Sequence, residues 1–404
     1  MKVLLVGSGA REHALAWTLS AGDGLTELHA APGNPGIARH GACHPVRPED
    51  GDALLGLARS LAIDLVVVGP EAPLVAGVAD TLRHGGVAVF GPSAAAARIE
   101  GSKSFAKTVM SAAGVATAET LPVARVPCVL KADGLAAGKG VVVCHTQEEL
   151  DAGLQALASL GGTLVIEELL EGEEVSLFAL CDGERAVALP PAQDYKRLED
   201  GDRGPNTGGM GAYSPVAALA DDEVAEVLET VHRPVLAELA ARGTPFVGLL
   251  YAGLMRTADG IRVLEFNCRF GDPETQVVLP RVEGDLLGAL AAAAAGSLDG
   301  VELRAADAAA VTVVVAAGGY PAGRDAGTPI EGVADAEAAG ALVFHAGTAL
   351  RGEALVTNGG RILSVTGTGA TLADARTVAY AGVERIRFPG ARHRTDVAAE
   401  AARV

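Results

Sequence analysis

Four apolar segments in the first hundred residues each run into a glycine, and this pattern constrains the fold more than any other feature of the chain. They lie within residues 2–6, 26–30, 64–71 and 87–93, with helices expected between them, at 11–20 and from about Val75. Near-continuously apolar strands that alternate with helices indicate a parallel sheet covered on both faces. Because ligands of such sheets bind beyond the carboxyl ends of the strands, we expect residues 1–100 to form a parallel α/β (Rossmann-like) domain with one wall of a binding site.

The composition excludes some partners. A formal net charge of −18 over 404 residues argues against binding to nucleic acid or a membrane surface, since both require basic patches. Small anionic substrates remain compatible, because a few lysines, arginines and helix N-termini can bind them. The five cysteines form no CxxC pair, so we expect buried free thiols and a reducing, cytoplasmic location. We expect no membrane helix or signal peptide, because no convincing apolar run of about 18–20 residues occurs and the opening apolar run is short.

The rest of the chain is expected to form three further units. Short strands with one helix among them predict a small antiparallel lobe over residues 101–190, which would contain a phosphate-binding flap. A turn-rich stretch at 193–215 opens a larger lobe over 191–325, and residues 326–404 form a small C-terminal α+β domain. The predicted fold class is therefore a multidomain protein of α/β and α+β type.

The first glycine turn is an incomplete dinucleotide-binding motif. Gly7 and Gly9 fit G-x-G-x-x-G, but Glu12 stands where the third glycine belongs. Glu27 has the spacing of a ribose-binding acid but lies near the start of the second strand. NAD binding is therefore disfavoured, and the alternatives are a tight turn or a helix N-terminus that approaches a phosphate.

Residues 131–140 read KADGLAAGKG, a glycine-rich loop whose spacing differs from that of a P-loop. Two strands joined by this loop predict a flap over phosphates. Lys131 would lie at a strand end and Lys139 on the flap, where both neutralise phosphate charge. Taken alone, the same stretch is an ordinary surface hairpin.

An acidic stretch follows at residues 167–174, EELLEGEE. Glu167 and Leu170 end a predicted strand whose backbone can hydrogen-bond an adenine edge. Glu174 is placed to bind ribose hydroxyls. Without further support, such an acidic turn is more often a solvated face.

The strand at 261–266 leads into the sequence EFNCRFGDPETQ. Alternation along the strand predicts that Val263, Glu265 and Asn267 share a face. A carboxylate and an amide oxygen two residues apart suit Mg²⁺, which takes few protein ligands and completes its shell with phosphate oxygens and water. Arg269 follows directly and places a cation beside the predicted metal.

Together these features resemble the ATP-grasp superfamily. The segments GSGAREHALAW, VGPEAPLVAG, GPSAAAARIEGSKSFAK, KADGLAAGKGV, QDYKR, GPNTGGMGAYSP, EFNCRFGDPETQ, AAGGYP, FHAGT and VTNGGR occur in the order seen in the phosphoribosylamine–glycine ligase family. This resemblance spans almost the whole chain. It departs at Ala10, where the family usually has glycine, at Tyr195, where QDHKR is common, and at residues 394–398, RTDVA, where R-x-DIG is usual.

The resemblance implies that ATP, glycine and 5-phosphoribosylamine give glycinamide ribonucleotide, ADP and phosphate through a glycyl phosphate, in de novo purine biosynthesis. It implies a metal site, for Mg²⁺ or Mn²⁺, at Glu265 and Asn267. The residues implied for ATP are Lys103, Lys131, Gly138, Lys139, Glu167, Leu170 and Glu174. Those implied for substrate are Gly9, Glu12, Asn34, Glu71, Asp194, Lys196, Arg197, Asn206, Thr207, Gly208, Gly209 and Asp272. The implied catalytic residues are Asp194, Lys139 and Arg269, the last for the glycine carboxylate and the developing acyl phosphate.

Acyl phosphates hydrolyse, so residues 134–140 and 204–211 are expected to close and exclude water. One alternative is another ATP-grasp carboxylate–amine ligase, against which QDYKR and GPNTGGMGAYSP argue. A second is a non-catalytic or dehydrogenase-like nucleotide-binding protein. Glu265, Asn267 and Lys139 argue against the non-catalytic reading, and Glu12 argues against the dehydrogenase-like one. We expect a monomer whose partners are its small-molecule substrates.

Overall fold

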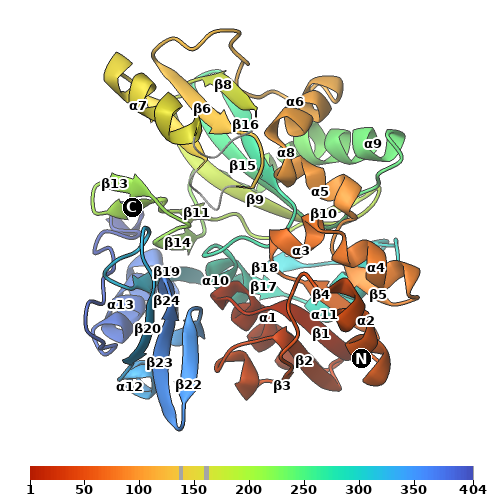
Figure 1. The fold of residues 1–404 in the computed structure, drawn as a ribbon, viewed down its shortest axis with the longest axis vertical. Helices are drawn as coiled ribbons and strands as arrows, with labels where there is room; N and C mark the ends of the chain where they lie inside the picture. Colours follow the sequence, from red (N-terminus) through yellow and green to blue (C-terminus); the bar gives the residue numbers. More distant parts are fainter. Residues whose placement is uncertain (136–139, 159–162, 404) are drawn as a thin grey trace.

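The computed structural model describes residues 1–135, 140–158 and 163–403. Its N-terminal part is a five-stranded parallel sheet in the order β3-β2-β1-β4-β5 (Figure 1). The strands are β1 (Lys2–Gly7), β2 (Glu27–Pro32), β3 (Ala42–Cys43), β4 (Leu65–Val68) and β5 (Ala88–Phe90). The central strands are buried along almost their whole length, which explains their near-continuous apolar sequence. The predicted parallel sheet is confirmed.

Helices cover both faces of this sheet. They are α1 (Ala10–Ser20), α2 (Gly51–Ser60), α3 (Glu71–Val75), α4 (Val78–His84) and α5 (Ala94–Gly101). Side-chain oxygens of Asp50 and Ser93 cap α2 and α5. The helix expected from about Val75 begins earlier, at Glu71, because Pro73 falls in its first turn, where proline is tolerated.

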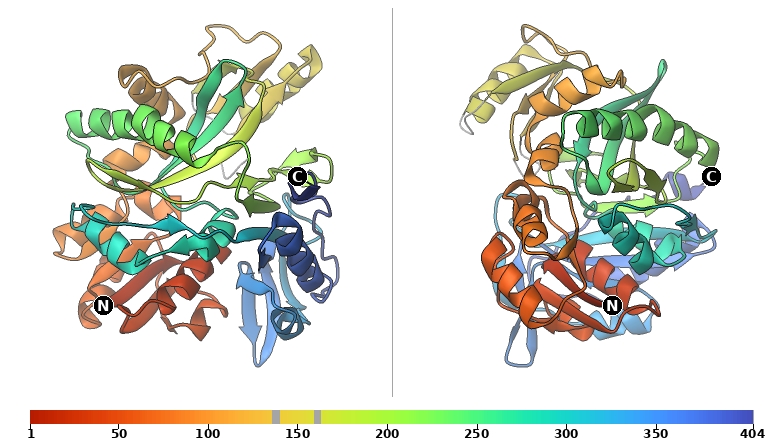
Figure 2. Two further views of the ribbon diagram at one scale, coloured as in Figure 1. Left: turned by 180° about the vertical axis from the view of Figure 1, so that it is seen from behind. Right: turned by 90° about the vertical axis from the view of Figure 1, so that its right-hand side faces the viewer.

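Two further sheets, called the central sheets below because they come from the middle of the chain, lie in the upper part of Figure 1, with the smaller sheet at the top (Figures 1 and 2). The smaller has the order β7-β6-β8, with β6 (Cys128–Ala132), β7 (Val141–Cys144) and β8 (Leu164–Glu168), and α7 (Gln147–Ala158) packs on it. The larger has the order β10-β9-β15-β16, with β9 (Glu173–Asp182), β10 (Ala186–Ala188), β15 (Val247–Thr257) and β16 (Gly260–Asn267). The helices around them are α6 (Lys103–Ala112), α8 (Asp221–Val227), α9 (Arg233–Ala241) and α11 (Leu286–Ala294).

The chain passes from the smaller to the larger sheet at residues 169–172. We expected β9 and β10 to belong to the smaller lobe, with its limit at residue 190. Instead β9 pairs with β15 along ten residues, so long-range pairing sets its sheet. The division into domains remains a prediction, and the strand pairing favours a limit before β9.

A third sheet joins the turn-rich stretch to the C-terminal part in the order β11-β14-β19-β24-β21. Its strands are β11 (Gln193–Asp194), β14 (Gly211–Ser214), β19 (Ala309–Ala316), β21 (Leu342–His345) and β24 (Arg361–Gly369), and α13 (Leu372–Val383) packs on β19 and β24. This sheet crosses the limit that we expected at residue 325. The buried strand β19 pairs on one side with β14 and on the other with β24, so it cannot be divided from the C-terminal strands.

The remaining elements are short. They are β12 (Arg197–Glu199), β13 (Arg203–Asn206), β17 (Val282–Glu283), β18 (Arg304–Ala305), β20 (Asp325–Pro329), β22 (Thr348–Arg351), β23 (Ala354–Gly359), α10 (Thr275–Val278) and α12 (Val333–Ala338). All five cysteines are free, and four are buried as expected; Cys43 is exposed because it lies on the two-residue edge strand β3. Within the described ranges, no helix combines the length and apolarity that crossing a membrane requires.

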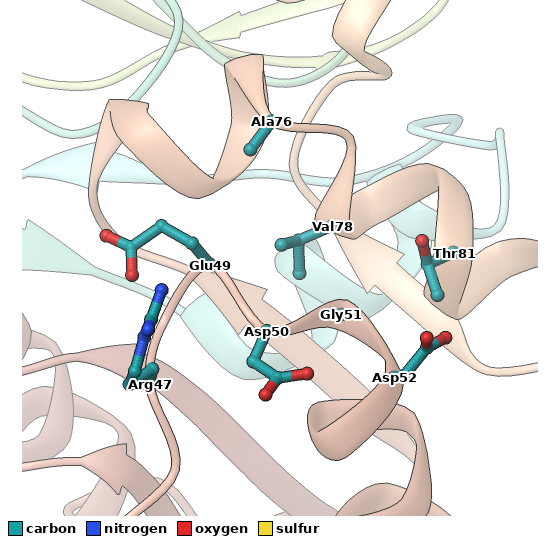
Figure 3. Close-up of a pocket in the computed structure, with 8 residues that line it drawn as sticks. All are labelled: Arg47, Glu49, Asp50, Gly51, Asp52, Ala76, Val78 and Thr81. Atoms are coloured by element: carbon teal, nitrogen blue, oxygen red, sulfur yellow. The ribbon is translucent and has the colours of Figure 1, made fainter.

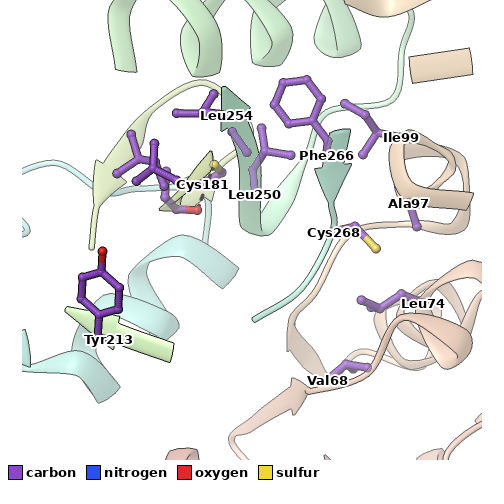
Figure 4. Close-up of a cluster of buried hydrophobic side chains, with 14 of the residues drawn as sticks. Val68, Leu74, Ala97, Ile99, Cys181, Tyr213, Leu250, Leu254, Phe266 and Cys268 are labelled. Carbon is purple, nitrogen blue, oxygen red and sulfur yellow. Dashed lines mark hydrogen bonds between the residues drawn. The ribbon is translucent and has the colours of Figure 1, made fainter. Parts of the chain in front are cut away.

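One apolar cluster connects the N-terminal sheet with the larger central sheet (Figure 4). Val68 and Leu74 contribute from β4 and α3, Ile99 from α5, Phe266 from the end of β16, and Cys268 from the residue that follows this strand. Burial of these side chains holds the carboxyl ends of β4 and β16 close together. The polar residues that follow the two strands therefore meet at the junction of the two parts.

Candidate active site

A β-bulge in β16 decides which side chains of the predicted metal motif share a face. In the pairing of β16 with β15, Leu264 is the extra residue. The bulge shifts the alternation, so Val263 packs in the apolar core together with Phe266. Glu265 and Asn267 share a face as expected, whereas the expectation that Val263 lies on that face is wrong.

The Glu265 carboxylate lies among cations from four different segments. In order of their effect on it, they are Lys196, Lys131, Lys103 and Arg269. Burial disfavours its ionisation, but the four cations outweigh burial and lower the pKa of Glu265. Glu265 is therefore ionised at neutral pH on a face that can also accept a strongly anionic ligand.

A buried ion-pair cluster lies behind this face. Glu167 accepts from Lys131 at 2.7 Å and from Lys107 at 2.8 Å, and its side chain is 3 % exposed. Lys131 Nζ also donates to the carbonyl of Leu264, 2.9 Å away. Both oxygens of Glu167 are thus paired with lysines, so a contact with adenine at this position would come from its backbone.

Two of the other predicted ATP residues, Lys103 and Leu170, are described by the structure. Lys103 begins α6, and its Nζ donates to the Gly134 carbonyl at 3.0 Å. Leu170 lies in the connection between the two central sheets. Gly138 and Lys139 lie outside the described residues. Lys103, Lys107, Lys131 and Lys196 are called the lysine group below.

Lys196 lies between three carboxylates. Its Nζ donates to Glu174, and Asp194 and Glu265 are the next carboxylates that raise the pKa of Lys196, against the effect of burial. Burial raises the pKa of Asp194 well above its ordinary value; Lys196 opposes this effect, and Glu274 adds to it. The structure therefore brings together Glu174, Asp194, Lys196 and Glu265, which the sequence assigned to three different ligands.

A second set of charges lies where the N-terminal domain meets β16. Arg269 pairs with Glu71 at 3.2 Å and with Glu100 at 3.4 Å, and Arg11 lies 3.9 Å from Glu71 and 2.5 Å from Glu12. Burial would raise the pKa of Glu71, but Arg269 and Arg11 outweigh it and lower that pKa to about 2. This set places Arg269 between carboxylates of two N-terminal helices.

The loop after β16 extends this set to the C-terminal strands. Arg361, on β24, pairs with Asp272 at 2.6 Å and donates to the carbonyl of Gly208. Gly209 has a φ of 103°, and a Cβ there would lie 2.3 Å from Pro273, so this close approach requires glycine. The three arginines Arg11, Arg269 and Arg361, with their partners Glu12, Glu71, Glu100 and Asp272, are called the arginine network below.

Several residues predicted to bind substrate already make contacts within the protein. Glu12 accepts from the backbone of Gly9 at 2.6 Å, so a carboxylate of the same helix lies at the turn where a phosphate was expected. The Asn34 side chain accepts from Gly36 and Ile37 and donates to the carbonyls of Ser8 and His345. Asn34 therefore ties the N-terminal domain to β21.

The predicted loop residues 206–209 are held by nearby strands. Asn206 donates to the carbonyl of Val141 at 3.4 Å, and Thr207 donates to the carbonyl of Lys196 at 2.9 Å. Arg197 donates to the carbonyl of Gly204 at 2.8 Å and supports its own hairpin.

Sequence reasoning did not assign Arg11, Glu100, Lys107 and Arg361. Glu100 accepts from the backbone of Cys268 at 2.7 Å as well as from Arg269, and no spacing in the sequence predicts either contact. A hollow of about 360 Å³ lies elsewhere, in the N-terminal domain (Figure 3). Its lining residues are Arg47, Glu49, Asp50, Gly51, Asp52, Ala76, Val78 and Thr81, none of which was predicted to bind a ligand.

The metal site fits a hard cation that is shared with a phosphate. Glu265 and Asn267 offer a carboxylate and an amide oxygen on one face, and the Asn267 oxygen has one long contact, to Arg269 at 3.4 Å. Among the described residues, no cluster of three or more His, Cys, Asp or Glu side chains forms a metal cage. This donor set suits Mg²⁺ bound mainly through phosphate and water oxygens.

The parallel-sheet domain, the paired central sheets and the Glu265–Asn267 face flanked by lysines define an enzyme of the ATP-grasp class. Solved structures share this fold. Biotin carboxylase from Campylobacter jejuni, in a β-γ-ATP complex, matches with a TM-score of 0.71 at 12 % identity, over 97 % of this chain and 92 % of that one. At this identity the likeness shows the fold alone.

The particular family follows from closer matches. Residues 1–100, 101–275 and 310–400 match the N domain, the ATP-grasp (A) domain and the C domain of phosphoribosylglycinamide synthetase. The chain is 54 % identical over 418 residues to the phosphoribosylamine–glycine ligase of Streptomyces coelicolor, with both chains fully covered. The crystal structure of that ligase from Thermotoga maritima matches with a TM-score of 0.85 at 35 % identity, over 98 % of this chain and 100 % of that one. The chain therefore belongs to the phosphoribosylamine–glycine ligase family and is a ligase.

Proposed function

We propose that this chain joins glycine to 5-phosphoribosylamine, at the expense of ATP, where the lysine group meets the arginine network. The observation that carries the proposal is the position of Glu265. Its carboxylate lies among three lysines and Arg269, so one face offers sites for a triphosphate and for a carboxylate. The names of the full-length relatives support the same reaction.

ATP would bind along the lysine group. Lys103 and Lys131 would contact its phosphates, the backbone near Glu167 and Leu170 its adenine, and Glu174 its ribose. The roles of Gly138 and Lys139 rest on the sequence alone. A divalent cation held by Glu265 and Asn267, which we propose to be Mg²⁺, with Mn²⁺ as a substitute, would neutralise charge on the transferred phosphoryl group.

Glycine would bind with its carboxylate against Arg269. The planar guanidinium presents several N–H donors, and its present partners Glu71 and Glu100 fix its orientation. A carboxylate oxygen of glycine attacks the γ-phosphorus, the bond to the bridging oxygen breaks, and ADP leaves. Arg269 would stabilise the charge that develops on the phosphoryl oxygens.

The amine nitrogen of 5-phosphoribosylamine then attacks the carbonyl carbon of the glycyl phosphate, and inorganic phosphate leaves with one former carboxylate oxygen. Asp194 would accept the proton that this nitrogen loses. Burial, the largest cause, raises the pKa of Asp194, which makes its carboxylate a stronger base than that of an exposed aspartate. The other substrate contacts would come from residues 206–209, Lys196, Arg197, Asp272 and the N-terminal residues Gly9, Glu12, Asn34 and Glu71.

The test is phosphate release from ATP and Mg²⁺, with and without glycine and freshly prepared 5-phosphoribosylamine. We expect release to need both substrates and to disappear in Glu265→Ala. Asp259→Ala, at the exposed turn of the same hairpin, is the matched control and should retain activity. Equal release without glycine would contradict the proposed substrate.

We further propose that the chain acts as a monomer in the cytoplasm. The residues proposed for all three reactants come from one chain, and the five unpaired thiols suit a reducing compartment. Sedimentation at working concentration checks the oligomeric state.

A further inference from the structure

The extended segment that runs from β11 to β12 and carries Asp194 and Lys196 has a second face, on which Tyr195 lies. Side chains alternate along an extended strand, so Tyr195 points away from its two neighbours. The backbone of Tyr195 extends the hydrogen bonding between β11 and β14, since its N–H donates to the Gly211 carbonyl at 2.9 Å. Its hydroxyl accepts from the backbone N–H of Ala398, also at 2.9 Å. The C-terminal residues thus lie directly behind the proposed substrate residues.

Arg394 is the centre of this contact. Its side chain is 1 % exposed and donates twice to Asp396, at 2.7 and 2.6 Å. It also donates to Asp202 at 2.7 Å and to the carbonyl of Arg197 at 3.2 Å. Its guanidinium lies 4.6 Å from the centre of the Tyr195 ring. A guanidinium this deeply buried is stable because partners on both sides satisfy its N–H groups.

Further contacts fasten the same two segments. Asp200 accepts from the backbone of Thr395 at 2.8 Å, and Gly201 donates to Asp396 at 2.8 Å. Val397 is fully buried, and a Cβ at Gly211 would lie 2.7 Å from its side chain. Residues 394–398, called the closing segment below, therefore pack against residues 195–202 and β14 as one unit.

We infer that the closing segment positions Asp194 and Lys196 for 5-phosphoribosylamine, acting through Tyr195 and the β12–β13 hairpin. The inference rests on the proposed substrate roles of Asp194 and Lys196. Among the contacts of the described residues, none joins the closing segment to the side chain of Asp194 or Lys196. Its effect passes through the backbone, because a shift of Tyr195 moves the residues on both sides of it. The carbonyl of Lys196 also accepts twice from Thr207, at 2.8 and 2.9 Å, so the 206–209 loop moves with it.

The chain offers a matched control. Tyr380, on α13, holds the closing segment from the other side. Its hydroxyl accepts from the backbone of Val397 at 3.1 Å and donates to the carbonyl of Arg394 at 3.0 Å. Tyr195→Phe and Tyr380→Phe each remove one hydroxyl that accepts from a backbone N–H of the closing segment. They differ in whether the lost bond leads to the substrate residues.

The experiment compares the kinetics of Tyr195→Phe, Asp202→Asn and Tyr380→Phe. Tyr195→Phe loses one hydrogen bond, and Asp202→Asn loses the charge that strengthens the bond from Arg394. KM for 5-phosphoribosylamine should therefore rise about threefold to tenfold in both variants, with KM for ATP changed less than about twofold. The Asp202 side chain is 71 % exposed, so its variant should fold even where a buried change would not. Tyr380→Phe should leave both KM values within about twofold of the parent. An unchanged KM in Tyr195→Phe, or an equal rise in Tyr195→Phe and Tyr380→Phe, would overturn the inference.

Hydrogen exchange gives a second readout that needs no activity. The backbone amides of residues 193–207 should exchange faster in Tyr195→Phe and Asp202→Asn than in the parent, but not in Tyr380→Phe. Unchanged exchange in the first two variants would overturn the inference by itself. A parent protein without glycine-dependent phosphate release but with the expected exchange pattern would instead contradict the proposed function.

Discussion

The lysine group and the arginine network both hold buried cations against carboxylates, but they distribute the charges differently. Behind the metal face, Glu167 pairs with both Lys107 and Lys131. In the arginine network, Arg269 pairs with both Glu71 and Glu100. Around Glu167, two lysines therefore share one carboxylate, and this local excess of cations suits the most anionic ligand, ATP. In the arginine network, several carboxylates fix the orientation of the guanidinium groups, which suits the positioning of ligands smaller than ATP.

This difference predicts unequal tolerance to the loss of one carboxylate. Glu167→Gln removes the negative charge that two buried lysines share and should destabilise the protein by about 3–5 kcal/mol. Urea unfolding measures this loss. Glu168→Gln, at the next position, is the control and should cost less than about 1 kcal/mol. Equal losses in the two variants would show that the buried pairs do not dominate this region.

The arginine network should make the free energy of unfolding depend on pH. Its arginines, acting against burial, lower the pKa of Glu71 from 4.5 to about 2 in the folded chain. The contribution is therefore fully present above pH 4.5 and is lost as the pH falls toward 2. Its upper limit is about 3 kcal/mol, and Glu71→Gln should remove this part of the pH dependence. Unfolding at pH 7 and pH 3.5 tests this, and parallel losses in parent and variant would contradict it.

The separation of roles can be tested at Arg269. Arg269→Lys retains the charge but loses the planar set of guanidinium N–H donors, so kcat/KM for glycine should fall about 10- to 100-fold. Binding of ATP, measured by calorimetry, should change less than about threefold, because the lysine group is intact. Arg262→Lys, on the same strand, is the control. A similar loss of ATP binding and of glycine use would show that the two regions act as one site.

The smallest expected effect concerns the segment behind Lys196. Ala398 has a φ of 56°, a left-handed conformation that glycine adopts without strain, and the family pattern has glycine at this position. Ala398→Gly should therefore stabilise the protein by about 0.5–1 kcal/mol, the relief of strain being partly offset by the greater freedom of glycine when unfolded. Thermal unfolding checks the direction. A lower melting temperature would mean that the Ala398 methyl group contributes packing that outweighs the strain.

The two regions also differ in how far the sequence could predict them. In the lysine group, Lys131 follows from the strand-and-glycine pattern around it, and the neighbouring Glu265 follows from the pattern of its own strand. Lys107 was missed as a site residue because its role depends on packing against Glu167. In the arginine network, Arg361 meets Asp272 across 89 residues of chain. Glu100 meets the backbone of Cys268, next to Arg269, across 168 residues, and no local pattern encodes either contact.

The fold shows the same limit. The parallel sheet was predictable because its strands are buried on both faces and read as apolar runs. The sheet of β19 was not, because its two neighbours come from distant segments on either side of the expected limit. The face of Val263 was predicted wrongly because strict alternation ignores the bulge at Leu264.

The central claim is that glycine is activated by phosphoryl transfer at the junction of these two regions. The most direct measurement follows the carboxylate oxygen: glycine labelled with ¹⁸O in its carboxyl group is turned over with ATP and 5-phosphoribosylamine, and the inorganic phosphate is examined by mass spectrometry. The account predicts one ¹⁸O atom in each phosphate released, because phosphate leaves with a former carboxylate oxygen. Phosphate without ¹⁸O, formed together with the ligated product, would contradict it.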